Sequence, residues 1–403
     1  MKNVKIAGVI AECNPFHEGH RYLIEKIREE TGADYVILAM AGAFVQRGEP
    51  ALVRTAVRTQ MALAGGADAV FLLPVRYALS SAEFFAKAGV TILNGLGCDL
   101  IAFGAEHPLP EILTAAKDLA AETPEQGDLI RRLVRGGCSY PKARAAAFPE
   151  YADLLSSPND ILAAEYAKAW MRLSGDAYPT YLHAVRRVNG VSGREGGAVY
   201  PDARGSSLRK RLLCGDPHAF DAVPEACRVF LQKELDAGGA VLPDDFSLPA
   251  CLMIRYAAAE GTLEDYADVS ADLAGAIRTA AAENITVTGM AEAISAKNRI
   301  TARVKRSILH IVLDIRKEEN ALSGIYTQLL GFRKSSDGVL GVIDSRRDIP
   351  LLAKPADHAR VLPEDADRRF MEDANAEDVY EAARSLKTGE KPVSVFKRPV
   401  IIL

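Results

Sequence analysis

The first part of the chain alternates short apolar runs with longer segments whose apolar positions recur at helical spacing. An uninterrupted apolar run of strand length is typical of a strand that is buried on both faces of a sheet. Strands that alternate with helices form parallel sheets with right-handed crossovers. The pattern therefore predicts a parallel α/β sheet, with any ligand bound beyond the carboxyl ends of its strands. The four predicted strands lie at residues 4–11, 34–42, 68–74 and 98–107.

Helices and further elements complete this prediction. A capped helix at 156–173 and a last strand at 180–190 are expected to belong to the same domain. The loops after the strands are the candidate ligand loops, because the carboxyl ends of parallel strands meet at one edge of the sheet. These loops lie at residues 12–20, 42–50, 74–80 and 104–108, and the helices between the strands at about 18–31, 53–65 and 80–97.

The pattern changes after about residue 215. Helical periodicity dominates residues 217–316, where Ala, Leu, Glu and Arg are prominent, and this predicts a helical domain. From residue 324 onward, short apolar runs and a helical segment suggest a small α/β module. The predicted division is therefore an α/β domain at 1–215, a helical domain at 216–320 and a carboxyl-terminal α/β module at 321–403.

Composition narrows the class of protein. Hydrophobic residues make up 49% and charged residues 25% of the 403 residues, the balance of an ordinary globular protein. No apolar run approaches the roughly 20 residues that span a bilayer, and the first residues lack a signal-peptide cleavage site. The six cysteines form no CxxC pair, so reduced thiols in the cytoplasm are expected and a zinc site is not. With a net charge of −4, RNA binding would need local basic patches.

Two of the seven histidines, His17 and His20, lie in the segment HEGH directly after the first predicted strand. A helix amino terminus offers free N–H groups and a positive dipole to a phosphate, and Gly19 leaves room for one. Imidazoles three residues apart share a helix face, and both can donate hydrogen bonds to phosphoryl oxygens. The motif therefore predicts stabilisation of charge on an attacked phosphate. The alternatives are a helix cap with one solvated histidine, or a two-histidine metal site without a third ligand nearby.

The strand, the segment NPFHEGH and the following helix resemble the HxGH nucleotidyltransferase superfamily, which includes the class I tRNA synthetases. The resemblance implies a Rossmann-like HxGH nucleotidyltransferase sheet at the start of the chain. Nearly the whole chain resembles one family in particular, the bacterial tRNA(Met) cytidine acetate ligases. That family activates acetate with ATP as acetyl-adenylate, releasing pyrophosphate, and then acetylates N4 of the wobble cytidine of elongator tRNA(Met), releasing AMP. The segments that carry the resemblance are ECNPFHEGH, GAFVQRGEPA, FGAEH, SPNDILAAEY and SSLRKRL.

The resemblance implies an ATP site. Gly104 would let the adenosine pack on backbone, Asn159 would satisfy polar edges, and Arg187 would pair with a phosphate. A turn glycine, a helix cap and a surface arginine are the alternatives. Ser206 and Arg209, in a segment similar to the second superfamily signature, would hold the β- and γ-phosphates. The first ATP-binding segment comprises Ile10, Ala11, Glu12, Cys13, Asn14, Pro15, Phe16, His17, Glu18, Gly19, His20, Arg21, Tyr22 and Leu23.

The sequence departs from the family pattern at two places in this site. Arg204 and Gly205 stand where small hydroxyl residues or alanine are common, and Cys13 stands where an aromatic residue is often found. The loop after the second strand supplies Gln46 and Arg47, which are candidates for contacting acetate or the acyl-phosphate. An exposed loop arginine without a function is the alternative.

Basic residues gather at helical spacing in residues 297–310, with smaller basic clusters at 186–187, 209–212, 332–334 and 345–347. A solvated basic helix is the ordinary explanation of such a run, whereas several clusters around one cleft would form a tRNA surface. The candidate tRNA-binding residues are Lys297, Arg299, Arg303, Lys305 and Arg306.

The leading hypothesis is an ATP-dependent acetate ligase that acts on elongator tRNA(Met), with His17, His20 and Arg47 as catalytic residues. Mg²⁺ is expected to bridge the phosphates of ATP, with Glu12 or Glu106 as guesses for its ligands. A plain adenylyltransferase of a cofactor precursor would share the HxGH site but would need no long basic helical half. A non-catalytic RNA-binding protein on the same fold is the third hypothesis, and the intact histidines argue against it.

Overall fold

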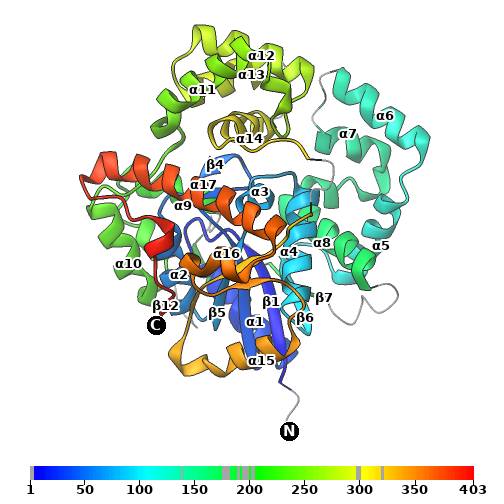
Figure 1. Cartoon of the computed structure of the whole chain (residues 1–403). Coiled ribbons are helices and arrows are strands. Elements are labelled where there is room, and N and C mark those ends of the chain that lie inside the picture. The colour runs from blue at the N-terminus through cyan, green and yellow to red at the C-terminus, as the bar shows by residue number, and fades with distance from the viewer. Residues whose placement is uncertain are drawn as a thin grey trace.

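A single central sheet organises the molecule (Figure 1). The computed structural model describes residues 4–136, 138, 140–174, 182–187, 191–192, 199–200, 205–295, 301–318 and 322–403. Within these residues the strand order is β11-β10-β5-β2-β1-β6-β7, and β12 also pairs with β10. The five strands from β5 to β7 are parallel, which confirms the predicted α/β fold. The strands of the sheet are β1 (Ile6–Ala11), β2 (Tyr35–Ala41), β5 (Ala69–Leu73), β6 (Leu100–Ala105), β7 (Leu182–Arg186), β10 (Thr327–Phe332), β11 (Leu351–Leu352) and β12 (Ile401–Ile402).

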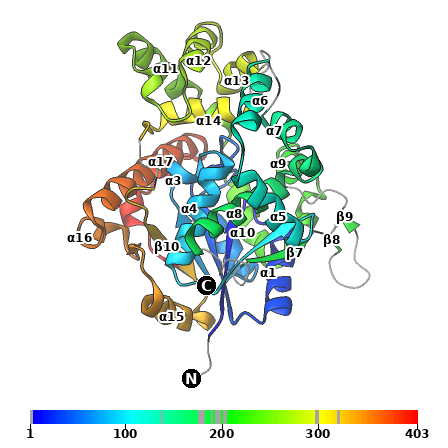
Figure 2. The same cartoon turned by 90° about the vertical axis from the view of Figure 1, so that its right-hand side faces the viewer.

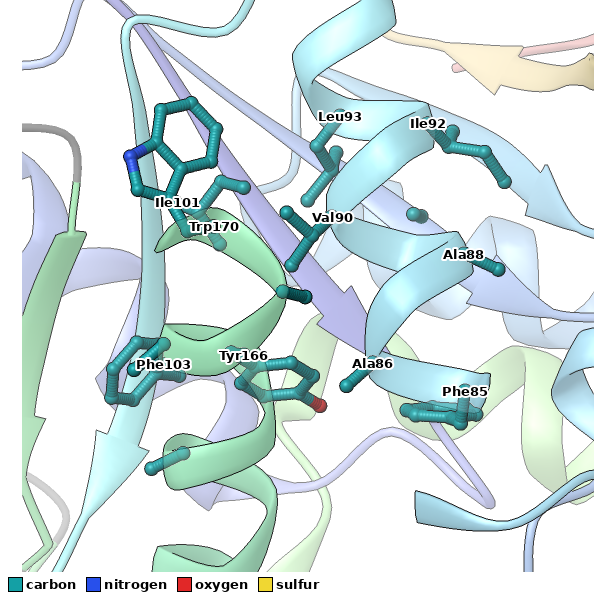
Figure 3. Close-up of a cluster of buried hydrophobic side chains, with 14 of the residues drawn as sticks. Phe85, Ala86, Ala88, Val90, Ile92, Leu93, Ile101, Phe103, Tyr166 and Trp170 are labelled. Carbon is teal, nitrogen blue, oxygen red and sulfur yellow. The ribbon is translucent and has the colours of Figure 1, made fainter. Parts of the chain in front are cut away.

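Helices cover both faces of the sheet, because successive side chains of a strand point to opposite faces. On β2, Leu38 packs in a cluster with α1 (Glu18–Thr31) and α2 (Thr55–Ala64). Its neighbour Ala39 lies in the cluster with α4 (Ala82–Gly95) and α8 (Pro158–Ser174) on the other face. Figure 3 shows this second cluster, where Val90 of α4 and Trp170 of α8 meet Ile101 of β6. The central strands are therefore buried on both sides, as their uninterrupted apolar runs predict.

A group of four helices lies beyond the sheet, at the top of both views (Figures 1 and 2). They are α11 (Ser247–Glu260), α12 (Ala271–Glu283), α13 (Val287–Ser295) and α14 (Thr301–Val312). They share one hydrophobic cluster, in which Ile254, Ile277 and Ile308 are buried. The predicted helical segment is thus present. The structure also shows that α10 (Glu225–Asp236) packs on α2, beside the central sheet, where the Cys227 thiol donates to the Met61 carbonyl oxygen at 3.1 Å.

The carboxyl-terminal segment joins the central sheet. Strand β10 pairs antiparallel with β5 at its edge, and β11 and β12 pair with β10. The last segment thus completes the sheet of the first segment. The division of the chain into three folding units stays a prediction. Other carboxyl-terminal elements are α15 (Gly338–Arg346), α16 (His358–Val361) and α17 (Glu364–Thr388).

Helix α17 fixes the chain at the carboxyl ends of two strands. Glu377 accepts hydrogen bonds from the Ala43 amide at 2.9 Å, just after β2, and from the Thr55 hydroxyl at 2.6 Å, at the start of α2. Asp373 accepts the Val75 amide at 2.5 Å, just after β5. Both carboxylates are buried. They satisfy backbone N–H groups that would otherwise be left without partners inside the protein.

Several elements lie outside the strands and helices that the hydrophobic pattern predicts. Helices α5 (Leu109–Ala120), α6 (Pro124–Arg135) and α7 (Tyr140–Ala147) follow β6. A two-stranded hairpin, β3 (Phe44–Val45) with β4 (Glu49–Pro50), follows β2. The remaining elements are α3 (Val75–Ala78), α9 (Gly205–Leu213), β8 (Val191–Ser192), β9 (Val199–Tyr200) and short 3₁₀ helices at Pro149–Tyr151, Leu154–Ser156, Ala219–Ala222, Pro243–Phe246, Leu263–Asp265, Lys334–Ser336, Pro355–Asp357 and Val395–Lys397. Among the described residues, none of the helices is both long and apolar enough to cross a bilayer.

Candidate active site

The two motif histidines lie at the start of α1, directly beyond β1. His17 is the N-cap residue, and its Nδ1 accepts the Gly19 amide at 3.1 Å. The Nδ1 of His20 accepts the His17 amide at 3.2 Å, so the two side chains satisfy two free N–H groups of the helix start. The ring centroids are 4.0 Å apart. Because both Nδ1 atoms act as acceptors, the proton of each neutral imidazole is on Nε2.

Both histidines are held neutral. Burial, together with the charges of His20, Arg187 and Arg209, keeps the pKa of His17 well below its usual range. Burial, with the charge of Arg187, lowers the pKa of His20 to about 4. At neutral pH the site therefore presents two uncharged Nε2–H donors side by side. Gly19 is required here, because a Cβ at this position would lie 2.9 Å from Cε1 of His17.

Asn14 is fixed from two sides in the turn between β1 and α1. Its Oδ1 accepts the Leu52 amide at 2.8 Å, and its backbone oxygen accepts Nη1 of Arg209 at 2.9 Å. Its Nδ2 is buried and has no hydrogen-bond partner among the described residues. A buried amide donor without a partner is unfavourable unless a ligand oxygen accepts it. Asn14 therefore supplies a third neutral donor beside the histidines.

The rest of the first segment packs around this turn. Phe16 is buried and its ring stacks on His20 with centroids 5.1 Å apart. Cys13 is buried with a φ of 47°, a left-handed conformation that is unusual for a residue with a side chain. Arg21 is engaged within α1, with Nε donating to Glu18 at 2.6 Å. Tyr22 and Leu23 are partly buried against the hydrophobic cluster that α1 shares with the sheet, and Ala11 belongs to the same cluster. Ile10 packs on the opposite face of the sheet, and Pro15 is buried.

The hairpin after β2 reaches the same edge of the sheet. The backbone N–H of Gln46 donates to Oε1 of Glu12 at 2.9 Å, and this bond joins the hairpin to the end of β1. Burial raises the pKa of Glu12, and the hydrogen bond from Gln46 and the charge of Arg47 partly offset this effect. The Arg47 side chain is exposed. The predicted candidates for acetate contact thus lie beside a half-buried carboxyl group at the end of β1.

A second group of predicted residues lies at the ends of β6 and β7. A Cβ on Gly104 would lie 3.3 Å from Cγ of Arg187, so the arginine stem lies over this glycine. Asn159 donates from Nδ2 to Glu106 Oε1 at 3.2 Å. Asp160, which is fully buried, accepts the Glu106 amide at 2.7 Å and contacts Nδ1 of His107 at 2.7 Å. Asp160 therefore shapes the loop after β6.

Helix α9 contributes to the site from the other side of the turn. Arg209 reaches the Asn14 carbonyl oxygen, while Ser206 is exposed at the start of the helix. A Cβ on Gly205 would lie 3.4 Å from the Asn14 oxygen, so the alanine or small hydroxyl residue that is common at this position would also fit. Arg204 lies outside the described residues.

Of the predicted tRNA-binding residues that the structure describes, one is buried and two are at least partly exposed. Arg306 is 7% exposed, and its Nε donates to Asp268 at 2.8 Å. This corrects the expectation that Arg306 lies on an exposed basic face, because α14 packs against the hairpin and its neighbouring helices. Lys305 pairs with Glu49 at 2.7 Å, and Arg303 is exposed and donates to the Asp268 carbonyl oxygen. Lys297 and Arg299 lie outside the described residues.

Arg58, a residue that sequence reasoning missed, holds the edge of the site together. It is fully buried on α2, and its Nη1 donates to the carbonyl oxygens of Glu12 and Ala41, both at 2.8 Å. It also donates to the carbonyl oxygens of Gly42 and Val53. One guanidinium thus joins the ends of β1 and β2. Its only signal in the sequence is that it is the one charged residue of α2.

The described residues contain no group of three His, Cys, Asp or Glu side chains that could hold a metal ion. Glu12 and Glu106, the guessed Mg²⁺ ligands, are engaged with different partners, Gln46 and Asn159. These residues do not fit a magnesium site built by the protein alone.

Comparison with known proteins shows which family the chain belongs to. Residues 4–392 match the model of the family described as HIGH Nucleotidyl Transferase. A tRNA(Met) cytidine acetate ligase of Acetivibrio thermocellus is 32% identical over 99% of this chain and 100% of the relative. One from Caldicellulosiruptor bescii is 31% identical over 85% of this chain and 86% of the relative. The crystal structure of Thermotoga maritima TmcAL bound with alpha-thio ATP has the same fold, with a TM-score of 0.84 at 23% identity and 99% coverage of both chains. The chain therefore belongs to the HIGH nucleotidyl transferases and, among them, to the tRNA(Met) cytidine acetate ligase family.

Proposed function

We propose that this protein is an ATP-dependent ligase that joins acetate to N4 of the wobble cytidine of elongator tRNA(Met), through acetyl-adenylate. Family membership supports this reaction. The observation that carries the proposal is the pair of neutral Nε2–H donors of His17 and His20 beyond β1. Donors fixed in advance of the reaction stabilise charge that develops on a phosphoryl group without reorganisation.

In the first half-reaction, an acetate oxygen attacks the α-phosphorus of ATP, and the bond to the leaving pyrophosphate breaks. The Nε2–H groups of His17 and His20 donate to the α-phosphoryl oxygens, and Nδ2 of Asn14 donates to a neighbouring phosphate oxygen. Arg209 neutralises charge on the leaving pyrophosphate, and Arg47 faces the acetate. These groups only position and stabilise charge, which is most of what phosphoryl transfer requires of a protein.

The adenosine is placed along the ends of β6 and β7. Gly104 lets it pack on backbone, Asn159 satisfies a polar edge, and Arg187 pairs with a phosphate. Asp160 acts as a positioning residue, because it holds the Glu106 amide and the His107 ring without a free oxygen for substrate.

In the second half-reaction, the N4 amine of cytidine attacks the acetyl carbonyl carbon, and the bond to AMP breaks. The amine loses a proton to solvent, and AMP leaves with the oxygen that acetate supplied. The RNA would approach over α14, where Arg303 and Lys305 are at least partly exposed. Lys297 and Arg299, which lie outside the described residues, stay candidates for the same role.

Mg²⁺ is expected to bind the phosphates of ATP, where it would neutralise charge on the pyrophosphate. No protein cage for it is proposed. The protein is proposed to act in the cytoplasm, where ATP and tRNA are available.

The direct test supplies ATP, labelled acetate and bulk tRNA, and follows pyrophosphate and label in RNA. Label in tRNA(Met), with one AMP and one pyrophosphate formed per acetyl group, is the expected result. Pyrophosphate release that depends on another acceptor, with none in RNA, would refute the ligase and favour an adenylyltransferase. His20→Ala should abolish acetate activation while tRNA binding survives, and loss of both would instead indicate a structural histidine.

A further inference from the structure

One carboxylate, Glu49, joins the nucleotide side of the protein to the helical group. Its Oε1 accepts Nζ of Lys305 at 2.7 Å, and its Oε2 accepts Nη2 of Arg209 at 3.2 Å. About a quarter of the Glu49 side chain is exposed, at 24%. Burial alone would raise the pKa of Glu49, but the hydrogen bonds and charges of Lys305 and Arg209 outweigh burial and lower it. Glu49 is therefore an anion that shares its single charge between two cations.

The two cations face different parts of the molecule. Arg209 belongs to α9 and also holds the Asn14 carbonyl oxygen, beside the histidines. Lys305 belongs to α14, among the helices beyond the sheet. Each cation is a partner for a polyanion: Arg209 for the triphosphate, and Lys305 for an RNA phosphate.

The backbone that carries Glu49 is held on both sides, so the carboxylate can follow a cation only by turning its own side chain. A Cβ on Gly48 would lie 2.6 Å from the backbone nitrogen of Arg306, so the hairpin tip is seated directly on α14. On its other side, the Gln46 amide is bonded to Glu12 at 2.9 Å. The hairpin backbone is thus held on both sides, which limits how far the Glu49 carboxylate can move with either cation.

We propose that Glu49 couples two binding events unfavourably. Binding of a triphosphate to Arg209 weakens the binding of a tRNA phosphate to Lys305, and binding of the tRNA phosphate weakens that of the triphosphate. The first polyanion to bind leaves Glu49 with one cation, and the second leaves it with none. A partly buried carboxylate without a partner is unfavourable, so the second binding event is weaker than it would be alone. This inference rests on the proposed function, and it makes Glu49 a positioning residue rather than a catalytic one.

The consequence concerns the order of the two half-reactions. When tRNA takes Lys305, Glu49 has its full charge available for Arg209 and draws this arginine away from the phosphates. Departure of pyrophosphate and engagement of tRNA therefore favour each other. The protein binds ATP best before tRNA is engaged, and binds tRNA best after pyrophosphate has left.

The test measures the affinity of ATP by calorimetry, without acetate and at constant ionic strength, in the absence and presence of a saturating tRNA(Met) transcript. Couplings between sites are commonly about five-fold or more, and we expect the transcript to weaken ATP binding by about five-fold. AMP is the matched ligand control, because it lacks the phosphates that Arg209 would hold, and its affinity should not change. The measured quantity is the ratio of the ATP dissociation constant with the transcript to that without it. In Glu49→Gln and in Lys305→Gln this ratio should fall to about one.

Arg347→Gln is the matched protein control, because it also removes one exposed positive charge, which is paired with Asp344 at 2.9 Å on α15. It should keep the wild-type ratio. The proposal is overturned if the wild-type ratio is one, if tRNA tightens ATP binding, if AMP is weakened as much as ATP, or if either site variant keeps the five-fold ratio. Since Lys305→Gln leaves Glu49 in place, the test stands even where Glu49→Gln does not fold.

Acetyl transfer to tRNA by the wild-type protein is measured on the same preparation. Its absence refutes the proposed function itself, whereas transfer together with a ratio of one refutes only the role of Glu49.

Discussion

Removal of the buried guanidinium of Arg58 is the perturbation whose effect follows most directly from the structure. It donates to four carbonyl oxygens, those of Glu12, Ala41, Gly42 and Val53. A hydrogen bond from a charged group contributes about 1.5–3 kcal/mol, so the four together contribute roughly 6–12 kcal/mol. Burial of the charge opposes this by several kcal/mol, and it lowers the pKa of Arg58. Arg58→Met, which keeps most of the volume, should therefore lower the free energy of unfolding by about 3–5 kcal/mol.

The assay is urea unfolding, with the midpoint and slope compared between variants. Arg58→Lys keeps the charge but lacks the planar fork, so we expect a loss between those of the wild type and Arg58→Met. Arg347→Met, which replaces an exposed arginine directly after α15, should change the free energy of unfolding by no more than about 0.5 kcal/mol. A loss below about 1 kcal/mol for Arg58→Met would refute the conclusion that this side chain holds the ends of β1 and β2 together.

Three further predictions address the histidines, the hairpin and α17. Because the pKa of His20 is lowered to about 4, acetate-dependent exchange of pyrophosphate into ATP should show no histidine inflection between about pH 6 and pH 8, and a clear inflection near the ordinary histidine value would contradict the neutral pair. Gly48→Ala should weaken tRNA binding and lower the urea midpoint, because the left-handed φ of 75° and the nearby α14 backbone both exclude a Cβ; unchanged binding and stability would show that the hairpin is not seated on α14. Burial raises the pKa of Asp373 to about 7, so the folded state binds this proton more tightly than the unfolded state does, and the free energy of unfolding should fall by up to about 4 kcal/mol as the pH rises from about 4 to 7. Asp373→Asn should flatten this slope in urea melts, and an equally steep slope in the variant would assign it to other groups.

The sheet and the first motif were predictable because local pattern and position suffice for them. The run Ile6–Ala11 is buried on both faces and leads into α1 through a capped turn, and each of these features has a short-range signal. The HEGH segment could be assigned to a phosphate site because it directly follows a predicted buried strand.

The contacts that link distant segments could not be predicted. Strand β10 joins the sheet next to β5 from more than half the chain away, and its short apolar run does not indicate a partner. The β3–β4 hairpin has two residues in each strand, too few to show an alternating pattern. The exposure of a charged side chain also depends on its tertiary surroundings: Arg303 and Arg306 are equally basic in the sequence, yet only Arg306 is buried against the hairpin.

The central claim is that acetate attacks the α-phosphorus of ATP beside His17 and His20. Acetate labelled with oxygen-18 in both carboxylate oxygens tests this claim, in a complete reaction with ATP and tRNA(Met), by mass spectrometry of the AMP and of the nucleosides of the tRNA. The predicted result is AMP with one oxygen-18 atom, formed in equal amount to acetylated cytidine, because the attacking oxygen stays on phosphorus when the amine takes the acetyl group. Acetylated cytidine together with unlabelled AMP, or no acetate-dependent AMP at all, would contradict it.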